Sequence, residues 1–535
     1  MSFENLKYYT PSNPSNHANE ISSDLVVYGG TPAGITAAIQ AKQKGLSVVI
    51  VEFSNHIGGM TASGLGATDF GAKEAVGGLS REFYKRIGQY YGKEEQWTFE
   101  PKVAKFIFTK WLEENEIPVY YLQHLKEVEM ENKKIKRIAM ENGNIFIGHI
   151  FVDASYEGDL MAKAGISYYV GRESNATYNE TYNGVQFGYP HHKFEVPVDP
   201  YVIEGKNESG LLPGITEPEL QEIETRGQGD KRIQAYNFRL CLTQDEENRI
   251  PFPKPPYYDP NRYTLLLRYI NAGVWDAMNL HTLLPNGKTD LNNYGAVSTD
   301  YIGMNYEWPE GSYETRERIF QDHFNYNLGM LYFLANDSQV PLSIREEVAK
   351  WGLPKDEFVK TGHWPPQLYI RESRRMISDY VVTDHNCLGQ SVINDSIGLA
   401  SYQMDSHHCR RVVIAGQCVN EGDVEIPISP YSISYRSVRP REEECTNILV
   451  PVCLSASHIA FGSIRMEPVF MILGQSVGVA ASLAFKDKTT VQGIQYAKLK
   501  KELLRVNQVL EWDSAIEDDP IERMNETFGK SDKKV

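Results

Sequence analysis

A glycine-rich hexapeptide near the start of the chain has the residue types and the spacing that bind a dinucleotide. It reads Gly29-Gly30-Thr31-Pro32-Ala33-Gly34. It aligns with the pattern G-x-G-x-x-G, whose glycines allow a tight turn, a close approach to a pyrophosphate and close helix–strand packing. Thr31 replaces the middle glycine, a departure that a small side chain can accommodate. Glu52 follows near the spacing at which an acid accepts hydrogen bonds from ribose hydroxyls, so this segment is expected to bind a dinucleotide.

A strand–helix–strand unit must position these residues, and the sequence predicts one. Residues 25–28 form an apolar strand, residues 32–44 a helix that Gly45 ends, and residues 47–51 a second apolar strand. Continuous apolar strands are typical of a parallel sheet covered on both faces. Loop, strand, helix and acid together favour a bound nucleotide over the alternative, a tight turn without one.

A second glycine pair points to the kind of cofactor. It lies in His56-Ile57-Gly58-Gly59-Met60, just past the acid, where a turn would bring backbone amides towards an extended dinucleotide. Ordinary NAD domains do not usually carry this feature. The stretch 26–71 resembles the FAD-dependent oxidoreductase family of the glutathione-reductase-like fold, some of whose members are labelled xanthan lyases. Segments 77–84, 151–160 and 454–481 are similar to the same family, whereas the middle of the chain is covered only thinly.

The resemblance implies FAD as the cofactor and a set of residues that bind it. The glycine-rich turn and the acid would bind the ADP half, the second glycine pair would lie near the pyrophosphate or flavin, and the segment at 153–155 would close over the adenine. A C-terminal helix would aim its amides at the flavin pyrimidine, although its glycines are equally explained by helix packing. The residues expected to bind the cofactor are Gly29, Gly30, Thr31, Pro32, Ala33, Gly34, Glu52, Phe53, Gly58, Gly59, Met60, Asp153, Ala154, Ser155, Gly474 and Gln475.

Hydride transfer to a flavin benefits from a base, and histidine is suited to this because its pKa lies near neutral pH. His458 is the first candidate, because the segment carrying the resemblance should pass beside the isoalloxazine. Arg465 would hold an oxygen anion or the flavin pyrimidine. Tyr435 and Arg436 are the next candidates. The alternative for His458 is a hydrogen-bonded structural role.

Other polar clusters have more than one interpretation. Arg371, Arg374 and Arg375 would clamp a carboxylate or the flavin phosphates, or form ion pairs at a domain interface. The adjacent pairs His191-His192 and His407-His408 point in different directions and rarely chelate one metal, so no metal site is expected.

Composition excludes several classes of function. The net charge of −16 argues against a nucleic-acid-binding surface. We expect no membrane partner, because no segment approaches the roughly 20 uninterrupted apolar residues that cross a bilayer. The first twenty residues do not resemble a secretory signal. Six cysteines without metal-ligand spacing fit reduced thiols, which favours a cytoplasmic protein.

The expected fold is α/β, with a Rossmann-like FAD-binding domain built as a three-layer ββα arrangement around a parallel central sheet, and an inserted mixed α+β substrate domain. Helices are expected at 79–91 and 103–115, followed by strands at 126–130 and 135–140. A further strand is expected at 411–415 and an apolar helix at 470–484. The expected division is a flexible arm at 1–20, the FAD-binding domain at 21–165 and 410–490, a substrate or cap domain at 166–409, and a C-terminal helix and polar tail at 491–535.

The function expected is oxidation of an alcohol or similar C–H bond in a small polar, carbohydrate-related substrate by hydride transfer to flavin. No second glycine-rich unit for NAD(P)H appears, so electrons would pass to or from oxygen, a quinone, another protein or a small donor. The alternatives are a flavin-dependent reductase of an activated double bond, a lyase or hydrolase with structural or absent FAD, and a non-catalytic flavin-binding partner. The sequence leaves the oligomeric state open.

Overall fold

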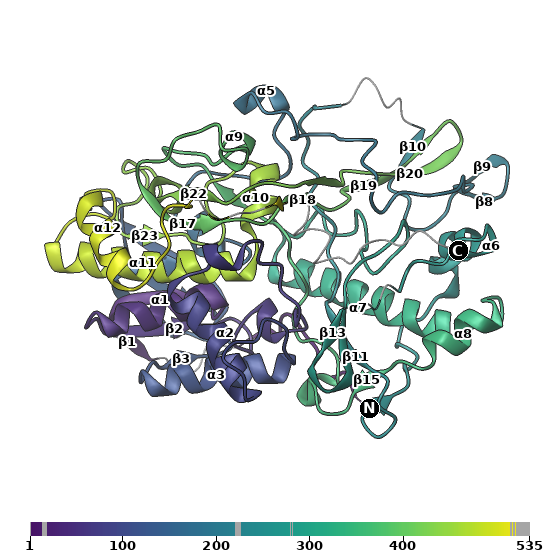
Figure 1. The fold of residues 1–535 in the computed structure, drawn as a ribbon, viewed down its shortest axis with the longest axis horizontal. Coiled ribbons are helices and arrows are strands. Elements are labelled where there is room, and N and C mark those ends of the chain that lie inside the picture. Colours follow the sequence, from purple (N-terminus) through teal and green to yellow (C-terminus); the bar gives the residue numbers. More distant parts are fainter. Residues whose placement is uncertain are drawn as a thin grey trace.

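The computed structural model describes residues 2–12, 19–219, 226–278, 280, 282–513, 516 and 519–520. Figure 1 shows two regions, one made mainly of early and late segments of the chain and the other mainly of its middle. The first, in purple and yellow, contains the largest sheet. The second, in teal, holds shorter strands and the long helix α7 (Tyr313–Asn336).

A seven-stranded sheet forms the centre of the first region. Its strands follow the order β3-β2-β1-β6-β5-β4, and β23 pairs with β6 outside this path. The pairs β1–β2, β1–β6, β2–β3 and β6–β23 are parallel, whereas β4, β5 and the start of β6 form an antiparallel meander. The strands are β1 (Glu20–Tyr28), β2 (Val48–Val51), β3 (Val119–Tyr120), β4 (Leu125–Glu131), β5 (Lys134–Met140), β6 (Ile145–Asp153) and β23 (Ile448–Leu449). The expected parallel central sheet is thus confirmed, with an antiparallel extension.

The register of the sheet brings three strand ends together. Tyr28 lies opposite both Val51 and Asp153. The carboxyl ends of β1, β2 and β6 therefore meet at one edge, where ligands bind in open parallel sheets. The residues that follow these strands are the glycine-rich turn, Glu52 and Ala154.

Helices cover this sheet, and their packing depends on small residues. The helices of this region are α1 (Pro32–Gln43), α2 (Gly78–Tyr90), α3 (Pro101–Glu114), α4 (Asp159–Lys163), α10 (His458–Ile464), α11 (Glu467–Asp487) and α12 (Tyr496–Arg505). A Cβ added at Gly474 of α11 would lie 2.2 Å from the Ala33 carbonyl oxygen of α1, and one added at Gly478 would lie 2.6 Å from that of Ala37. The glycines of α11 therefore let the two helices approach closely.

Helix α11 is also long and apolar enough to cross a membrane by length and composition. However, 89% of its apolar window is buried inside the protein. A helix buried to this extent is typical of the core of a protein.

The middle of the chain forms small sheets and several helices. Its strands are β7 (Tyr168–Tyr169), β8 (Tyr201–Ile203), β9 (Lys206–Leu211), β10 (Glu217–Glu219), β11 (Leu240–Thr243), β12 (Arg249–Ile250), β13 (Leu283–Leu284), β14 (Lys288–Leu291), β15 (Leu353–Pro354), β16 (Arg375–Met376), β17 (Ser396–Ala400), β18 (Met404–Ser406), β19 (Arg410–Ile414), β20 (Gln417–Glu421), β21 (Val424–Ile426) and β22 (Tyr431–Ser434). The helices besides α7 are α5 (Asn175–Tyr178), α6 (Thr264–Asn271), α8 (Leu342–Val348) and α9 (Asp384–Cys387). Because β19 pairs with β10, strand pairing crosses the boundary expected between residues 409 and 410.

The N-terminal segment differs from the flexible arm that its polar sequence suggests. Leu6, Tyr8 and Tyr9 are buried. The backbone amides of Tyr8 and Tyr9 both donate to Glu317 Oε2 of α7, at 2.7 and 2.9 Å. Aromatic packing and these hydrogen bonds fix the segment, which composition alone could not reveal. Residues 13–18 and most of the polar tail after residue 513 lie outside the described residues.

Candidate active site

The turn between β1 and α1 has no room for side chains at its two outer glycines. A Cβ added at Gly34 would lie 2.0 Å from the Gly29 carbonyl oxygen, and one added at Gly29 would lie 2.8 Å from the backbone nitrogen of Ser155. Gly29 also has a φ of +104°, a conformation that favours glycine. The predicted roles of these two glycines, a tight turn and close packing, agree with the geometry.

Thr31 stands where the pattern has its middle glycine, and its hydroxyl is bonded to the backbone of the protein. Its hydroxyl donates to the Ala154 carbonyl oxygen at 2.7 Å and accepts from the Gly34 amide at 3.3 Å. Thr31 is thus the N-cap of α1. The remaining first-turn amides and the helix dipole suit the binding of a phosphate, so the replacement of the glycine is compatible with a dinucleotide.

Glu52 is buried and held by two backbone amides. Its carboxylate accepts from Gly30 N at 2.6 Å and from Ser54 N at 2.8 Å, one at each oxygen. A carboxylate oxygen can accept a second hydrogen bond, so Glu52 can also receive ribose hydroxyls. Burial raises the pKa of Glu52, and the amides oppose that rise.

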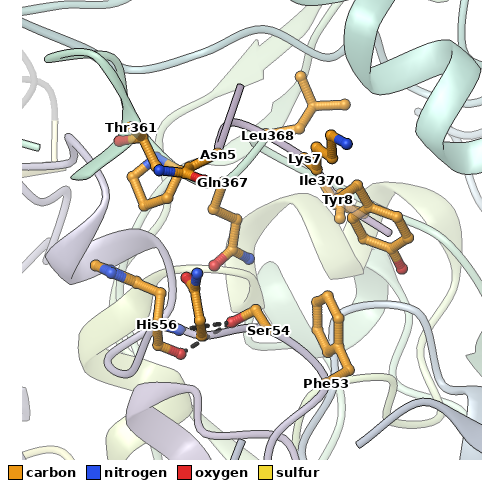
Figure 2. A pocket seen from close by; sticks show the side chains of 12 residues that line it. Asn5, Lys7, Tyr8, Phe53, Ser54, His56, Thr361, Gln367, Leu368 and Ile370 are labelled. Atoms are coloured by element: carbon orange, nitrogen blue, oxygen red, sulfur yellow. Dashed lines mark hydrogen bonds between the residues drawn. The ribbon is translucent and has the colours of Figure 1, made fainter. Parts of the chain in front are cut away.

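A pocket opens beside the segment that follows Glu52 (Figure 2). Phe53 and His56, which follow the acid, form one wall, and Tyr8 of the N-terminal segment and Gln367 contribute to the others. The pocket therefore adjoins the predicted position of the ribose. Its complete lining is Asn5, Lys7, Tyr8, Phe53, Ser54, Asn55, His56, Thr361, Pro366, Gln367, Leu368 and Ile370.

The second glycine turn lies against the first. Gly58 N donates to the Gly30 carbonyl oxygen at 2.8 Å. A Cβ added at Gly59 would lie 2.4 Å from the Tyr156 hydroxyl oxygen and 2.9 Å from Pro32 Cδ. Met60 N donates to that hydroxyl at 3.0 Å. These contacts place Gly59 and Met60 beside the start of α1.

Tyr156 and Glu467 connect this turn to the start of α11. The Tyr156 hydroxyl donates to Glu467 Oε1 at 2.7 Å, and the Thr61 hydroxyl donates to Glu467 Oε2 at 2.9 Å. Glu467 is the first residue of α11 and is buried. Burial raises its pKa to about 7, and the two hydroxyls only partly offset this.

Asp153 and Gln475, which are both predicted to bind the cofactor, form hydrogen bonds with other residues of the protein. Asp153 accepts from the amides of Ser155 and Met161, at 3.0 and 2.8 Å, and so shapes the turn that carries Ala154. Gln475 Oε1 accepts from Leu79 N at 2.8 Å, and Gln475 Nε2 donates to Gln40 Oε1 at 2.8 Å. These contacts of Gln475 join α11 to α2 and α1, and the close approach of Gly474 to Ala33 matches the packing alternative for the helix glycines.

A buried charged cluster lies where the second glycine turn, the middle of the chain and the start of α11 meet. A Cβ added at Gly64 would lie 2.0 Å from the Arg239 carbonyl oxygen, which ties the segment after the turn to this cluster. The guanidinium carbons of Arg371, Arg465 and Arg239 lie 4.7, 5.9 and 6.0 Å from the centre of the Tyr369 ring. Three cations therefore surround one aromatic ring.

Each of these arginines has a carboxylate partner. Arg239 pairs with Asp290 through Nε and Nη2, at 2.9 and 2.6 Å. Arg371 Nη1 lies 2.7 Å from Asp300 Oδ1, and Arg465 Nη2 lies 3.1 Å from Asp405 Oδ2. The buried charges are therefore balanced in pairs, which limits the cost of burial. The Nε atoms of Arg371 and Arg465 are buried without a hydrogen-bond partner among the described residues.

His407 belongs to the same cluster. Its Nδ1 lies 2.8 Å from Asp300 Oδ2, whereas its Nε2 lies 3.7 Å from Asp405 Oδ2, beyond hydrogen-bond reach. Burial and the nearby Arg371 hold the pKa of His407 well below its usual value. The ring is therefore neutral at pH 7, and the bond to Asp300 favours a proton on Nδ1 and a free lone pair on Nε2.

His458, the first candidate base from the sequence, lies behind the strand that leads to His407. Its Nδ1 is 2.7 Å from Glu372 Oε2, and its Nε2 is 2.9 Å from Ser406 Oγ. Both ring nitrogens therefore have protein partners, and neither is available to a substrate. This geometry matches the structural alternative, in which His458 supports the segment that carries His407.

The remaining candidate residues are bonded to partners outside this cluster. The Tyr435 hydroxyl donates to the Val491 carbonyl oxygen at 2.7 Å, and Arg436 forms a partly exposed ion pair with Asp395 at 3.0 Å. Arg374 pairs with Asp159 at 2.7 Å, and Arg375 pairs with Glu173 at 2.7 Å. Of these four side chains, none contacts the charged cluster in the described structure. Among the predicted catalytic residues, only Arg465 does.

The fold and the two glycine turns define a flavoprotein of the dinucleotide-binding type. The chain belongs to the family described as FAD dependent oxidoreductase, whose profile matches residues 24–503. It is therefore an FAD-dependent oxidoreductase, and its cofactor is FAD. The residues of the two glycine turns and Glu52 fit this cofactor by the contacts above. Membership of this family does not support the alternative of a lyase or hydrolase without FAD.

Solved structures match a smaller part of the chain. An L-amino acid deaminase from Proteus vulgaris is 16% identical, with a TM-score of 0.25, over 30% of this chain and 54% of that one. A THI4 protein from Thermovibrio ammonificans is 18% identical, with a TM-score of 0.22, over 28% of this chain and 66% of that one. The chain thus spans about half the length of the deaminase. No protein with a curated description matches this chain.

Sequence reasoning missed most of the charged cluster. Asp300, Tyr369 and Asp405 are isolated polar residues in a region without clear periodicity, so nothing local marks them. In the sequence His407 stands out only as half of an adjacent histidine pair. Arg371 belongs to a run of arginines, and of that run it alone joins the cluster.

Proposed function

We propose that this oxidoreductase oxidises the C–H bond next to a hydroxyl group in a small polar substrate. The observation that supports this is the Asp300–His407 pair inside a buried cluster of balanced charges. Paired arginines and carboxylates offer both donors and acceptors without a large net charge, which suits a substrate rich in hydroxyl groups. Bound FAD supplies the hydride acceptor for this chemistry.

The protein's own groups would handle the proton. His407 Nε2, with its lone pair free, accepts the proton of the reacting hydroxyl, and Asp300 stabilises the resulting positive charge on the ring. The Nε–H groups of Arg371 and Arg465, which have no partner among the described residues, would stabilise the negative charge that develops on the substrate oxygen. The cluster is buried, so water is largely excluded and these interactions are strengthened.

Anaerobic mixing tests this proposal. Polyols and sugars should bleach the flavin absorption of the wild-type protein, and His407→Gln should slow the bleaching while it retains FAD. Equal rates for the variant and the wild type would refute the role of His407. If no hydroxyl compound bleaches the flavin, the substrate class is wrong.

A flavin-dependent reduction of an activated double bond is the second candidate function. It is favoured by Tyr369, whose hydroxyl accepts a hydrogen bond from Arg465 Nη1 at 3.0 Å. Burial raises the pKa of Tyr369, so its hydroxyl stays protonated and can deliver a proton to carbon. Reoxidation of chemically reduced enzyme by an unsaturated acid, without bleaching by polyols, would favour this function.

We also propose a cytoplasmic location. The six cysteines are all buried and free, which agrees with a reducing compartment. Electron acceptors to screen are oxygen, quinones and protein acceptors.

A further inference from the structure

Two groups of three ligand-type side chains bring their oxygen or nitrogen atoms within 4.8 Å of one another. The first is Glu100, Asp356 and Glu357. We call it the lysine triad because its carboxylates surround Lys288. The second, the histidine triad, is His192, Asp423 and Glu425. The two triads have similar spacing but different surroundings.

The lysine triad encloses a cation supplied by the protein. Lys288 Nζ lies 2.7 Å from Glu100 Oε1, 2.9 Å from Asp356 Oδ2 and 2.8 Å from Glu357 Oε1. The Lys288 side chain is fully buried. Close, buried carboxylates repel one another, and this ammonium group offsets the repulsion.

The histidine triad has no such ammonium group. Among the described residues, the ion-pair contacts of Glu425 are with His191 and His192, at 3.8 and 3.7 Å, and Asp423 has none. Asp423 is 5% exposed, and its Oδ1 is buried with no hydrogen-bond partner in the described structure. A buried carboxylate oxygen without a donor is costly unless a ligand meets it.

Further acceptor atoms surround this carboxylate pair. Asp405 lies directly opposite Glu425 in the pairing of β18 with β21, so the two side chains share one face. Gln403 Nε2 donates to Glu425 Oε2 at 3.3 Å, and Gln403 Oε1 is buried without a partner among the described residues. The surroundings are therefore rich in oxygen atoms.

His192 is oriented towards these oxygens through its Nε2. Gly295 N donates to His192 Nδ1 at 3.2 Å, so in the neutral ring the proton is on Nε2, the atom 3.7 Å from Glu425 Oε1. The ring thus presents an N–H group, and not a lone pair, to the triad. The metal ligands available are oxygens, which are the donors that Ca²⁺, Mg²⁺ and Mn²⁺ prefer.

We propose that the histidine triad is a binding site for a divalent cation, held by the carboxylates of Asp423 and Glu425 with Gln403 Oε1 and water completing an oxygen shell. The cation takes the place that the Lys288 ammonium group has in the lysine triad. Because Asp405 also pairs with Arg465, the site lies on the wall of the charged cluster.

Manganese titration of the full-length, FAD-loaded protein tests the site. After dialysis against EDTA, bound Mn²⁺ is measured as the loss of the free-ion electron paramagnetic resonance signal. We expect one saturable site per chain, and at least a 10-fold weaker affinity in Asp423→Asn. Asp356→Asn, in the lysine triad, is the matched control and should leave the affinity within 2-fold of wild type.

The flavin spectrum shows whether each variant is folded, since it does not depend on manganese. If Asp423→Asn fails to retain FAD, Glu425→Gln takes its place with the same expected loss. Absence of saturable binding in the wild-type protein, or equal affinity in wild type and the triad variant, would overturn the proposal.

Discussion

The two parts of the active site are built in different ways. Around the cofactor turns, backbone atoms approach so closely that side chains are excluded, as at Gly34 and Gly29. In the charged cluster, long polar side chains such as Arg371 and Arg465 fill the space and are held by carboxylates. The cofactor turns therefore depend on the absence of side chains, whereas the charged cluster depends on the charged groups of its side chains.

This difference predicts how a substitution in each part affects cofactor binding and activity. An added side chain at the turns should remove the cofactor, because no neighbouring backbone can give way. A changed side chain in the cluster should leave the cofactor in place and alter the chemistry instead. The following predictions test that separation, from the largest expected effect to the smallest.

Gly34→Val should abolish FAD binding. The new Cβ would lie 2.0 Å from the Gly29 carbonyl oxygen, a clash that requires the turn itself to move, with a cost on the order of 4 kcal/mol or more. The purified variant should be colourless, and added FAD should not restore its absorption spectrum.

Gly45→Ala is the control for that variant. Gly45 follows the same helix and has a φ of +92°, but nothing lies within 4 Å of its added Cβ. Alanine should therefore cost only about 1 kcal/mol of backbone strain and leave FAD bound. A colourless Gly45→Ala protein would mean that general instability, and not the close approach at Gly34, explains the loss.

His407→Gln should lower the rate of anaerobic flavin reduction by about 10²- to 10⁴-fold, the usual contribution of a general base. FAD should remain bound, because His407 contacts carboxylates of the cluster and not the glycine turns. Stopped-flow absorbance with the best polyol substrate measures the rate.

His458→Gln distinguishes the two histidines. Since both nitrogens of His458 already bond to Glu372 and Ser406, its replacement should change the reduction rate by less than about threefold at saturating substrate and mainly lower stability. If His458→Gln lowered the reduction rate as much as His407→Gln, His458 would be the base.

Glu467→Gln should remove a pH dependence of stability. The folded-state pKa of Glu467 is about 7, raised by burial above the ordinary value of 4.5. The folded protein therefore keeps this proton when the unfolded chain has lost it, so its stability falls as pH rises from about 4.5 to 7. The expected fall is up to about 3 kcal/mol. Urea unfolding of both proteins in excess FAD should show a smaller fall for Glu467→Gln, and identical pH profiles would contradict this account.

Glu52→Gln should weaken the FAD affinity by roughly 10-fold. The amide keeps one acceptor oxygen but loses the charge-assisted hydrogen bonds to ribose, worth about 1–2 kcal/mol. Fluorescence titration of the apoprotein with FAD measures the affinity. Reduction rates at saturating FAD should match the wild type, and a slower rate would show that the two parts of the site are not separable.

Much of the cofactor part was predictable from the sequence. The strands and helices up to Asp153 lie within a few residues of their expected positions, because apolar periodicity and glycine placement are local signals. The N-terminal segment was not predictable, since Tyr8 and Tyr9 are fixed by α7, which is about 300 residues away in the chain.

Local sequence signals do not distinguish between the two candidate catalytic histidines. His458 and His407 are both buried histidines near carboxylates, and nothing in their flanking residues tells which has a free nitrogen. That depends on Ser406 and Glu372 around one ring and on Asp300 and Asp405 around the other. Such partners come from distant segments and are known only when the chain is folded.

The sequence by itself determined the dinucleotide-binding unit and its acid, because spacing along one strand–helix–strand unit dictates where backbone amides and a carboxylate must lie. The kind of cofactor was implied by the resemblance to a known family. Only the tertiary structure decided which charged groups meet beside that unit. Arg239, Asp300, Tyr369 and His407 are separated by tens of residues, and their contacts follow from the packing of the middle region against both chain ends. Long-range packing, which no local pattern encodes, therefore selects the residues that can move a proton.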